Sequence, residues 1–169
     1  MPRQSCACHA SSGHWIWFSV PAPVNSVCAD APDKNQLLIQ TIDKPFSYLV
    51  PMSGFAHTIS VASFQSPNRI NVLLKNPSEE GQPIGFDDAV DFPRRFEWRE
   101  DAPATLSYVV ALDKGSGKSN APHRDALFLV EGKDGTYDMA LAREALRTTR
   151  RLRNILWGNQ QMALVYQAM

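Results

Sequence analysis

The first grouping that could do chemistry is a glycine-rich segment, residues 115–119 (GSGKS). It resembles the end of a phosphate-binding loop, where backbone N–H groups hold phosphate oxygens. The complete pattern needs a second glycine five residues before the glycine that precedes the lysine, and Leu112 occupies that position. The segment also leads into Asn120, Ala121 and Pro122 instead of a helix whose N-terminus could hold the phosphate. We therefore predict a flexible hairpin loop and expect no cofactor.

A second grouping lies near the start of the chain, where Cys6, Cys8 and His9 offer metal-ligating atoms. Their spacing is tighter than that of the usual structural zinc site, and no second pair of ligands follows. The chain holds three cysteines, an odd number that defines no disulfide framework. We predict no metal site, and interpret residues 1–29 as a leader or disordered segment of unclear origin.

The same segment has the outline of a secretory signal. Arg3 precedes a short apolar patch at residues 15–20, and small residues near position 28 would suit a cleavage site. Pro21 and Pro23 interrupt the patch, which argues against this interpretation. An export signal and a poorly ordered or misassigned start both stay open. The localisation is therefore not predicted, and without export the chain would be cytoplasmic.

A third grouping is the basic run of Arg147, Arg150, Arg151 and Arg153, which could contact nucleic acid or an acidic peptide. The aromatic residues that stack on single-stranded bases are missing from it. Lys+Arg and Asp+Glu both number 17, so the balanced charge gives no overall attraction to nucleic acid or to an anionic membrane. We expect neither as a partner, and a solvated face is the plain alternative for the run.

The elements that position these groups read as short strands. The 12 prolines and 9 glycines divide the chain into pieces too short for long helices. Residues 105–112, rich in Val, Tyr and Leu, make the strongest candidate strand. Further candidate strands lie at residues 37–42, 58–61, 70–74, 95–99, 126–130 and 162–166.

One segment, residues 139–153, departs from this pattern. It contains neither Gly nor Pro, and Leu141, Ala145, Thr149 and Leu152 recur at helical spacing. Taken alone, it predicts a basic amphipathic helix. In an all-β chain, tertiary pairing could override that preference. A short helix and a strand therefore both stay open here.

A weak repeat runs along the chain. Polar turns that begin at Asp33, Asp101 and Gly158 each lead into an apolar strand, and Trp98 and Trp157 precede the last two turns. The starts are 68 and 57 residues apart, longer than the ~40–50 residues of the common propeller repeats. The physical logic is the same, because one sheet cannot bury both of its faces and stacked sheets can.

We therefore expect an all-β fold of stacked antiparallel sheets over residues 30–169, and the family resemblance given below implies that it is an incomplete β-propeller of two to three antiparallel blades. Trp98, Trp157 and Tyr108 are its expected structural anchors, since the two tryptophans fall at equivalent places in the repeat. Open blade edges would pair with other strands, so we also expect self-association through them.

Three stretches carry a resemblance to a known family. They are residues 45–51 (PFSYLVP), residues 95–106 (RFEWREDAPATL) continuing to residues 123–125, and residues 157–166 (WGNQQMALVY). The central stretch is the longest and the most specific. Over roughly the last four-fifths of the chain, these stretches resemble part of the β-propeller of a prolyl-oligopeptidase-family serine peptidase, nearest the glutamyl endopeptidase branch.

The resemblance implies a role in proteolysis without catalysis. Members of this family join the propeller to an α/β-hydrolase domain whose nucleophile lies in a Gly-x-Ser-x-Gly elbow. That pattern occurs nowhere in the 169 residues, so no catalytic residues are predicted and the chain alone should be inactive. The implied function is a propeller fragment that lacks the hydrolase domain and, in the full-length family, filters which peptides reach the active site.

Glutamyl endopeptidases favour acidic substrates, so the resemblance makes Arg147, Arg150 and Arg151 candidates for attracting peptide substrates. The alternative function is a stand-alone binding module that uses propeller blades as a scaffold. A truncated gene product and a functional short form are equally compatible with the sequence.

Overall fold

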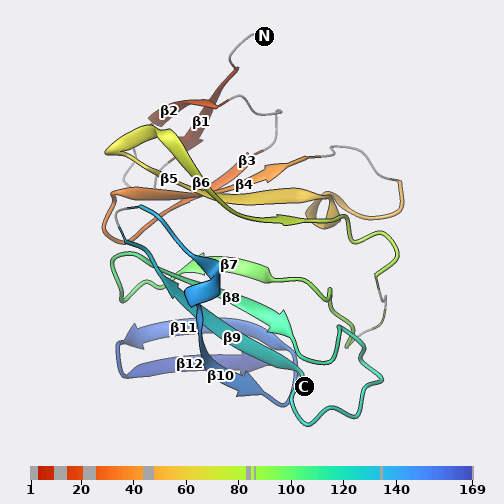
Figure 1. Ribbon diagram of the computed structural model, residues 1–169. Coiled ribbons are helices and arrows are strands. Elements are labelled where there is room, and N and C mark those ends of the chain that lie inside the picture. Colours follow the sequence, from red (N-terminus) through yellow and green to blue (C-terminus); the bar gives the residue numbers. More distant parts are fainter. Residues whose placement is uncertain are drawn as a thin grey trace. The chain divides into compact units, whose positions relative to one another are not determined.

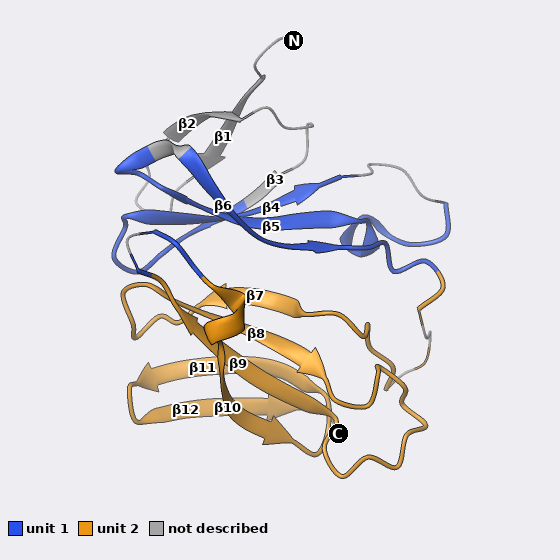
Figure 2. Cartoon of the chain, viewed as in Figure 1, with its two compact units in different colours: residues 1–80, 133–137 blue, residues 81–132, 138–169 orange. Residues whose placement is uncertain are grey.

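The computed structural model describes residues 4–9, 15–20, 26–43, 48–82, 85, 87–133 and 135–168, which form strands and turns (Figure 1). The chain divides into two compact units (Figure 2). Unit 1 comprises Met1–Glu80 and Lys133–Tyr137, and unit 2 comprises Gly81–Gly132 and Asp138–Met169. No helix in the described residues is long and apolar enough to span a membrane.

Unit 1 contains a four-stranded antiparallel sheet whose strands follow one another in sequence order. The strands are β3 (Ser26–Asp30), β4 (Gln36–Ile42), β5 (His57–Ser63) and β6 (Ser66–Asn76). The short 3-10 helix η1 (Met52–Gly54) precedes β5. The central strand β4 is apolar on both faces, as expected of a strand covered from two sides. Leu37, Ile39 and Ala62 form a buried cluster on which Cys28 and Phe64 pack.

Two further parts belong to unit 1. Strands β1 (Gln4–His9) and β2 (Trp15–Val20) form an antiparallel pair. Residues 133–137 also belong to this unit, because the Tyr137 hydroxyl donates to Gln36 Oε1 at 2.6 Å and its backbone N–H donates to Asn71 Oδ1 at 2.8 Å.

Unit 2 repeats the four-stranded plan and adds a hairpin. Its sheet runs in sequence order through β7 (Arg94–Trp98), β8 (Thr105–Ala111), β9 (Asp125–Glu131) and β10 (Arg143–Thr148). The hairpin consists of β11 (Leu152–Asn159) and β12 (Met162–Gln167). Val109 and Leu127 of the sheet form a buried cluster with Leu152 of the hairpin, and Ile155, Trp157 and Val165 pack against it. One face of the hairpin therefore lies on the sheet.

These sheets confirm the predicted all-β class. Four antiparallel strands in sequence order form the blade of a β-propeller. The described residues hold two such blades and two two-stranded sheets, β1–β2 and β11–β12, in agreement with the predicted incomplete propeller of two to three blades.

The repeat predicted at Asp33, Asp101 and Gly158 coincides with equivalent hairpins. These turns join β3 to β4, β7 to β8 and β11 to β12, which are the first two strands of each sheet. The first two hairpins close with matching hydrogen bonds, from Ala31 N–H to Gln36 O and from Arg99 N–H to Thr105 O, each 2.9 Å long.

The helix considered for residues 139–153 does not form. The segment instead contains the three-residue 3-10 helix η2 (Met139–Leu141), strand β10 and the start of β11. Leu146 and Thr148 turn inward at alternate positions while Arg143, Ala145 and Arg147 are exposed, so the observed period is two. Pairing with β9 satisfies the backbone of this segment and outweighs its local helical preference.

The start of the chain carries several sequence-based expectations. Strand β3 begins at Ser26, so the last residues of the segment 1–29 take part in the first four-stranded sheet. The metal alternative at Cys6, Cys8 and His9 concerns side chains outside the described part of the structure. The apolar patch of the export-signal interpretation coincides with β2, whose side chains are likewise not described, and residues 45–47 of the resembling stretch also lie outside the described residues.

Candidate functional site

The most concentrated charge in unit 2 is a buried cluster built around Arg151. The guanidinium of Arg151 donates to both carboxylate oxygens of Asp113, at 2.9 and 2.8 Å, and to Asp125 Oδ1 at 3.0 Å. The side chains of both aspartates are completely buried, and that of Arg151 is 4% exposed. Burial disfavours the charged guanidinium, but the hydrogen bonds to Asp113 and Asp125 outweigh it and raise the pKa of Arg151.

Two further arginines complete the cluster. Arg94 Nη2 donates to Asp125 Oδ2 at 2.7 Å, and the Leu152 backbone N–H donates to the same oxygen at 2.7 Å. Arg124 Nη1 reaches Asp113 Oδ2 at 3.3 Å. Three cations therefore surround two anions, and this excess of positive charge lies beside the surface of unit 2 at Arg124, whose side chain is 21% exposed. Buried carboxylates need such partners because an unpaired charge in the interior is costly.

The glycine-rich segment that suggested a phosphate loop is held by this cluster. Arg124 Nη1 donates to the backbone oxygens of Ser116 (3.2 Å) and Gly117 (2.8 Å). Gly115 has a φ of +79°, and its carbonyl accepts the Ala89 N–H at 2.9 Å. A side chain at Gly115 would bring a Cβ to 1.9 Å from the Ala89 oxygen. The glycine is thus required by a turn and a close backbone approach within the protein.

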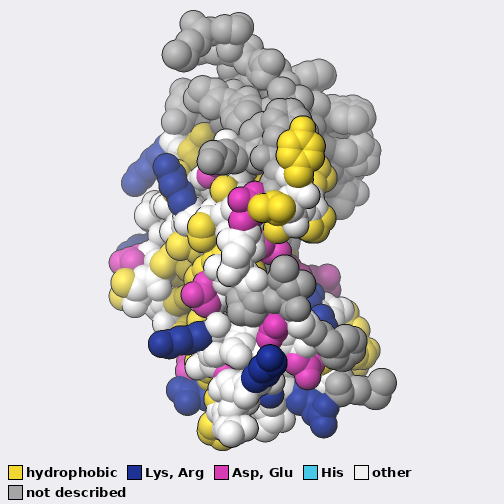
Figure 3. Space-filling model, turned by 90° about the vertical axis from the view of Figure 1, so that its right-hand side faces the viewer, with side chains coloured by type: hydrophobic (Ala, Val, Ile, Leu, Met, Phe, Trp, Pro, Cys, Tyr) yellow, Lys and Arg dark blue, Asp and Glu magenta, His cyan; other side chains and the backbone are white. Residues whose placement is uncertain are grey.

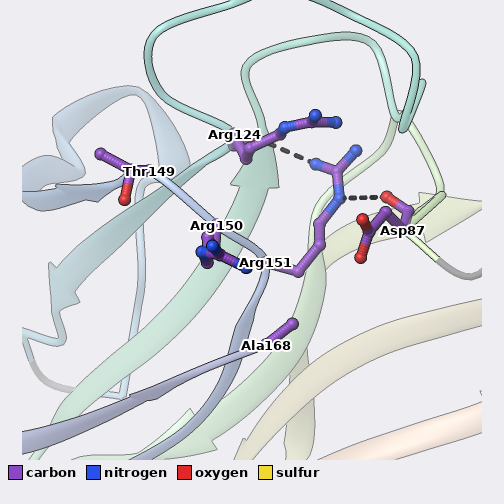
Figure 4. A pocket seen from close by; sticks show the side chains of 6 residues that line it. All are labelled: Asp87, Arg124, Thr149, Arg150, Arg151 and Ala168. Atoms are coloured by element: carbon purple, nitrogen blue, oxygen red, sulfur yellow. Dashed lines mark hydrogen bonds between the residues drawn. The ribbon is translucent and has the colours of Figure 1, made fainter.

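A polar pocket of about 320 Å³ opens beside the cluster (Figure 4). It is lined by Asp87, Arg124, Thr149, Arg150, Arg151 and Ala168. The Arg151 Nε–H donates to the Asp87 backbone oxygen at 2.8 Å, which anchors one wall. Arg150 is exposed, and its guanidinium has no hydrogen-bond or ion-pair partner among the described residues. Within the described residues, the pocket lining therefore holds one guanidinium without a partner, that of Arg150, and one carboxylate, that of Asp87. The Arg150 guanidinium is the group there that suits a carboxylate ligand.

The three arginines singled out from the sequence lie in three different environments. Arg147 is exposed on β10 and pairs with Glu144, with hydrogen bonds of 2.7 and 3.1 Å. Arg150 lines the pocket, whereas Arg151 is buried in the ion cluster. The turn between β10 and β11 separates them, because β10 ends at Thr148 and β11 begins at Leu152. The structure does not bring the three side chains together as one basic face.

The three expected anchors occupy the two sheets of unit 2. Tyr108 is buried at the centre of an aromatic stack, with its ring centroid 5.2 Å from that of Phe96 and 5.5 Å from that of Phe128. Trp98 is also buried. The Trp157 ring packs against the core, and the guanidinium carbon of Arg99 lies 4.3 Å from its centroid. Burial raises the pKa of the Tyr108 hydroxyl.

Sequence reasoning missed the aspartates at the centre of the cluster. Each is a single acidic residue at an end of a strongly apolar strand, Asp113 shortly after β8 and Asp125 at the start of β9. An acidic residue in such a place is buried only when it is paired. The sequence therefore indicated that both aspartates need a partner. It did not indicate which one, because Arg151 lies 38 residues from Asp113 and 26 residues from Asp125.

The remaining surface shows no concentration of one charge on the face in view. Basic and acidic side chains alternate over the described residues on this face (Figure 3). No group of three or more His, Cys, Asp and Glu residues that could hold a metal ion occurs in the described residues.

This chain is similar in sequence to proteins that are named as probable peptidases. It is 28% identical over 150 residues to the probable glutamyl endopeptidase, chloroplastic, of Oryza sativa subsp. japonica, and 27% identical over 151 residues to the protein of the same name in Arabidopsis thaliana. Each alignment covers 88% of this chain but only 16% and 15% of the relative. The chain is similar to one segment of these peptidases.

The chain therefore spans about one sixth of the length of these relatives. No protein-family profile matches it, and no solved structure matches it. The similarity agrees with the resemblance inferred from the sequence at the level of a peptidase relation.

Proposed function

We propose that this chain is a non-catalytic propeller segment of a glutamyl endopeptidase-like serine peptidase of the prolyl oligopeptidase family. One observation carries the proposal: blade-type sheets in sequence order lie along a stretch that is similar to probable glutamyl endopeptidases over 88% of the chain. Its blades would contribute to proteolysis by selecting the peptides that reach a catalytic domain, and the Gly-x-Ser-x-Gly elbow is absent from its own sequence.

The polar pocket gives this role a chemical basis. A substrate that carries glutamate presents a carboxylate, and Arg150, whose guanidinium has no partner in the described part of the chain, offers two-point recognition of that group. Arg124 and Arg151 also line the pocket, but their guanidiniums are engaged by Asp113. Arg150 is therefore the residue that we assign to attracting acidic peptides, and Arg147 and Arg151 are set aside for this role.

Two assays of the purified chain test the proposal. We expect no hydrolysis of a fluorogenic peptide with glutamate before the scissile bond, and no labelling by a fluorophosphonate, which reacts with activated serines. Cleavage that persists after removal of trace proteases and follows the chain through successive columns would overturn it. A glutamyl endopeptidase with a complete catalytic domain serves as the positive control.

A stand-alone binding module is the second candidate function. It is favoured by the internal completeness of unit 2, which has its own apolar core and its own ion cluster. This function requires a soluble particle that unfolds in one cooperative transition. Aggregation of the pure chain at low concentration during size-exclusion chromatography would contradict it.

A further inference from the structure

A second polar pocket opens in unit 2, at the other end of the strands from the pocket of Arg150. It has a volume of about 430 Å³ and is lined by the turn between β7 and β8, the end of β9, the start of β10 and the turn between β11 and β12. All of these segments belong to unit 2. The volume is in the range of known small-ligand sites, about 300–1,000 Å³.

Two side chains of opposite charge, Glu131 and Arg143, line this pocket. Neither the carboxylate nor the guanidinium has a hydrogen-bond or ion-pair partner among the described residues. The third charged residue of the lining, Arg99, is already engaged. Its Nε–H donates to Asp101 Oδ1 at 2.9 Å, its Nη2 donates to the other oxygen, and its guanidinium carbon lies over the Trp157 ring. Within the part of the chain that the structure describes, the lining thus holds one unpaired carboxylate and one unpaired guanidinium.

The strand register sets the spacing between these two charged residues. Arg143 of β10 lies directly opposite Leu129 of β9, and Glu131 follows Leu129 by two residues. Glu131 in turn lies opposite Thr105 of β8, which also lines the pocket. Because residues two apart on a strand share a face, Glu131 and Arg143 are diagonal neighbours on one face of the sheet, with backbone positions about 7–8 Å apart. Opposite charges at this spacing, not paired with each other, can each hold one end of a ligand.

The uncharged polar side chains of the pocket suit a peptide bond. The Thr105 hydroxyl and the Gln160 amide also line it. Each of these groups can both donate and accept, so together they can serve the N–H and the C=O of a ligand. Two residues in an extended conformation span about 7 Å, close to the spacing of Glu131 and Arg143, whereas one residue spans about half of that.

We propose that this pocket binds a dipeptide whose two termini are free. Its ammonium group pairs with the Glu131 carboxylate, its terminal carboxylate pairs with the Arg143 guanidinium, and its peptide bond meets Thr105 and Gln160. A longer peptide has its termini farther apart, so it can satisfy only one of the two charges. Binding of a dipeptide here is independent of the proposed role in proteolysis and of the pocket of Arg150.

Isothermal titration calorimetry of the full chain with L-alanyl-L-alanine tests the site, because the side chains of this probe carry no charge. We expect a dissociation constant between about 10 µM and 1 mM. Acetylation of the amino group and amidation of the carboxylate should each raise it at least about tenfold, since each change removes one charge-assisted contact. Alanine and trialanine, which are too short and too long, should also bind at least about tenfold more weakly. The capped dipeptides test both contacts without any substitution in the protein.

Two substitutions assign the contacts to their residues. In Glu131→Gln, acetylation of the dipeptide should no longer matter while amidation still does, and in Arg143→Gln the reverse should hold. Both residues are exposed, so both variants should fold. Glu144→Gln and Arg147→Gln are the matched controls, because they remove the same charges from exposed positions of β10 outside the pocket lining and should leave the dissociation constant unchanged.

Three results would overturn the proposal. They are no binding of the dipeptide at about 10 mM by the folded chain, equal affinity for the free and the capped dipeptides, and equal losses of affinity in all four variants.

Discussion

Arg151 and Asp113 form a two-point ion pair, with two parallel N–H···O contacts of 2.9 and 2.8 Å between side chains that are both buried. The pair joins the turn after β10 to the loop after β8. Asp125 at the start of β9 and Arg94 at the start of β7 extend it. Ion pairs therefore connect the ends of strands β7, β8, β9 and β10 along one edge of the unit 2 sheet.

Replacement of Arg151 by leucine should strongly destabilise the chain. The change leaves the buried carboxylates of Asp113 and Asp125 with too few partners, which costs about 3–5 kcal/mol of unfolding free energy. Arg150→Leu is the control, and the exposed position should change stability by about 0.5 kcal/mol or less. Urea denaturation followed by circular dichroism measures both, and equal effects of the two substitutions would contradict a structural role for the cluster.

Gly115→Ala should destabilise the chain more than Gly81→Ala. Both glycines have a positive φ, +79° and +81°, at which a side chain costs about 1–2 kcal/mol. Only at Gly115 does the added Cβ also collide with the Ala89 oxygen, whereas nothing lies within 4 Å at Gly81. Chemical denaturation of both variants separates the close approach from the backbone conformation. A Gly81→Ala variant as unstable as Gly115→Ala would show that the close approach adds nothing.

The contribution of Asp101 to stability should disappear in acid. A hydrogen bond from Arg99 lowers the pKa of the Asp101 carboxyl. A carboxylate whose pKa is lower in the folded state stabilises the protein above its unfolded pKa of about 3.9, and this stabilisation is lost as the pH falls through the folded value. The stability gap between the original chain and Asp101→Asn should therefore be widest at neutral pH and close below about pH 4.

Urea midpoints between pH 7 and pH 3 measure that gap. In an Arg99→Gln background, Asp101→Asn should show no such pH dependence, because the partner that shifts the carboxyl is gone. A gap that stays constant down to pH 3 would argue against the ion pair.

Arg150→Ala should weaken the binding of a glutamate-rich peptide, and Arg147→Ala should not. Arg150 lines the pocket and its guanidinium is unpaired among the residues that the structure describes, while Glu144 already neutralises Arg147. Loss of one charge-assisted contact corresponds to about 1.5–3 kcal/mol, or roughly a 10- to 150-fold weaker dissociation constant. Isothermal titration calorimetry at low salt provides the measurement. Equal loss in both variants would indicate a diffuse charge effect, and no loss in either would remove the pocket from the proposed function.

Local patterns in the sequence located much of the fold. The turns at Asp33, Asp101 and Gly158 are visible from polar residues followed by apolar runs, and each opens the same hairpin of its sheet. Local patterns could not show that residues 139–153 form strands. Their helical spacing is a local property, whereas the pairing of β10 with β9 joins segments that are distant in sequence.

The candidate site was harder to predict from the sequence, because it too depends on contacts between distant segments. A run of arginines predicts a common face only when the chain continues regularly, and the turn after Thr148 directs Arg150 to the pocket and Arg151 to the interior. The partners of Arg151, Asp113 and Asp125, come from two other segments, and their spacing in the sequence does not predict the pairing. Buried ion pairs between distant segments are therefore invisible until the topology is known.

Residues 133–137 belong to unit 1 although they follow most of unit 2 in sequence, and this limits where the chain could be divided. A gene segment that ends at residue 80 would encode unit 1 without Tyr137, whose hydroxyl and backbone N–H satisfy Gln36 and Asn71. A segment that begins at residue 81 would carry that tyrosine away from its partners. Neither unit is a contiguous stretch of sequence, so no single break in the chain separates the two units from each other cleanly.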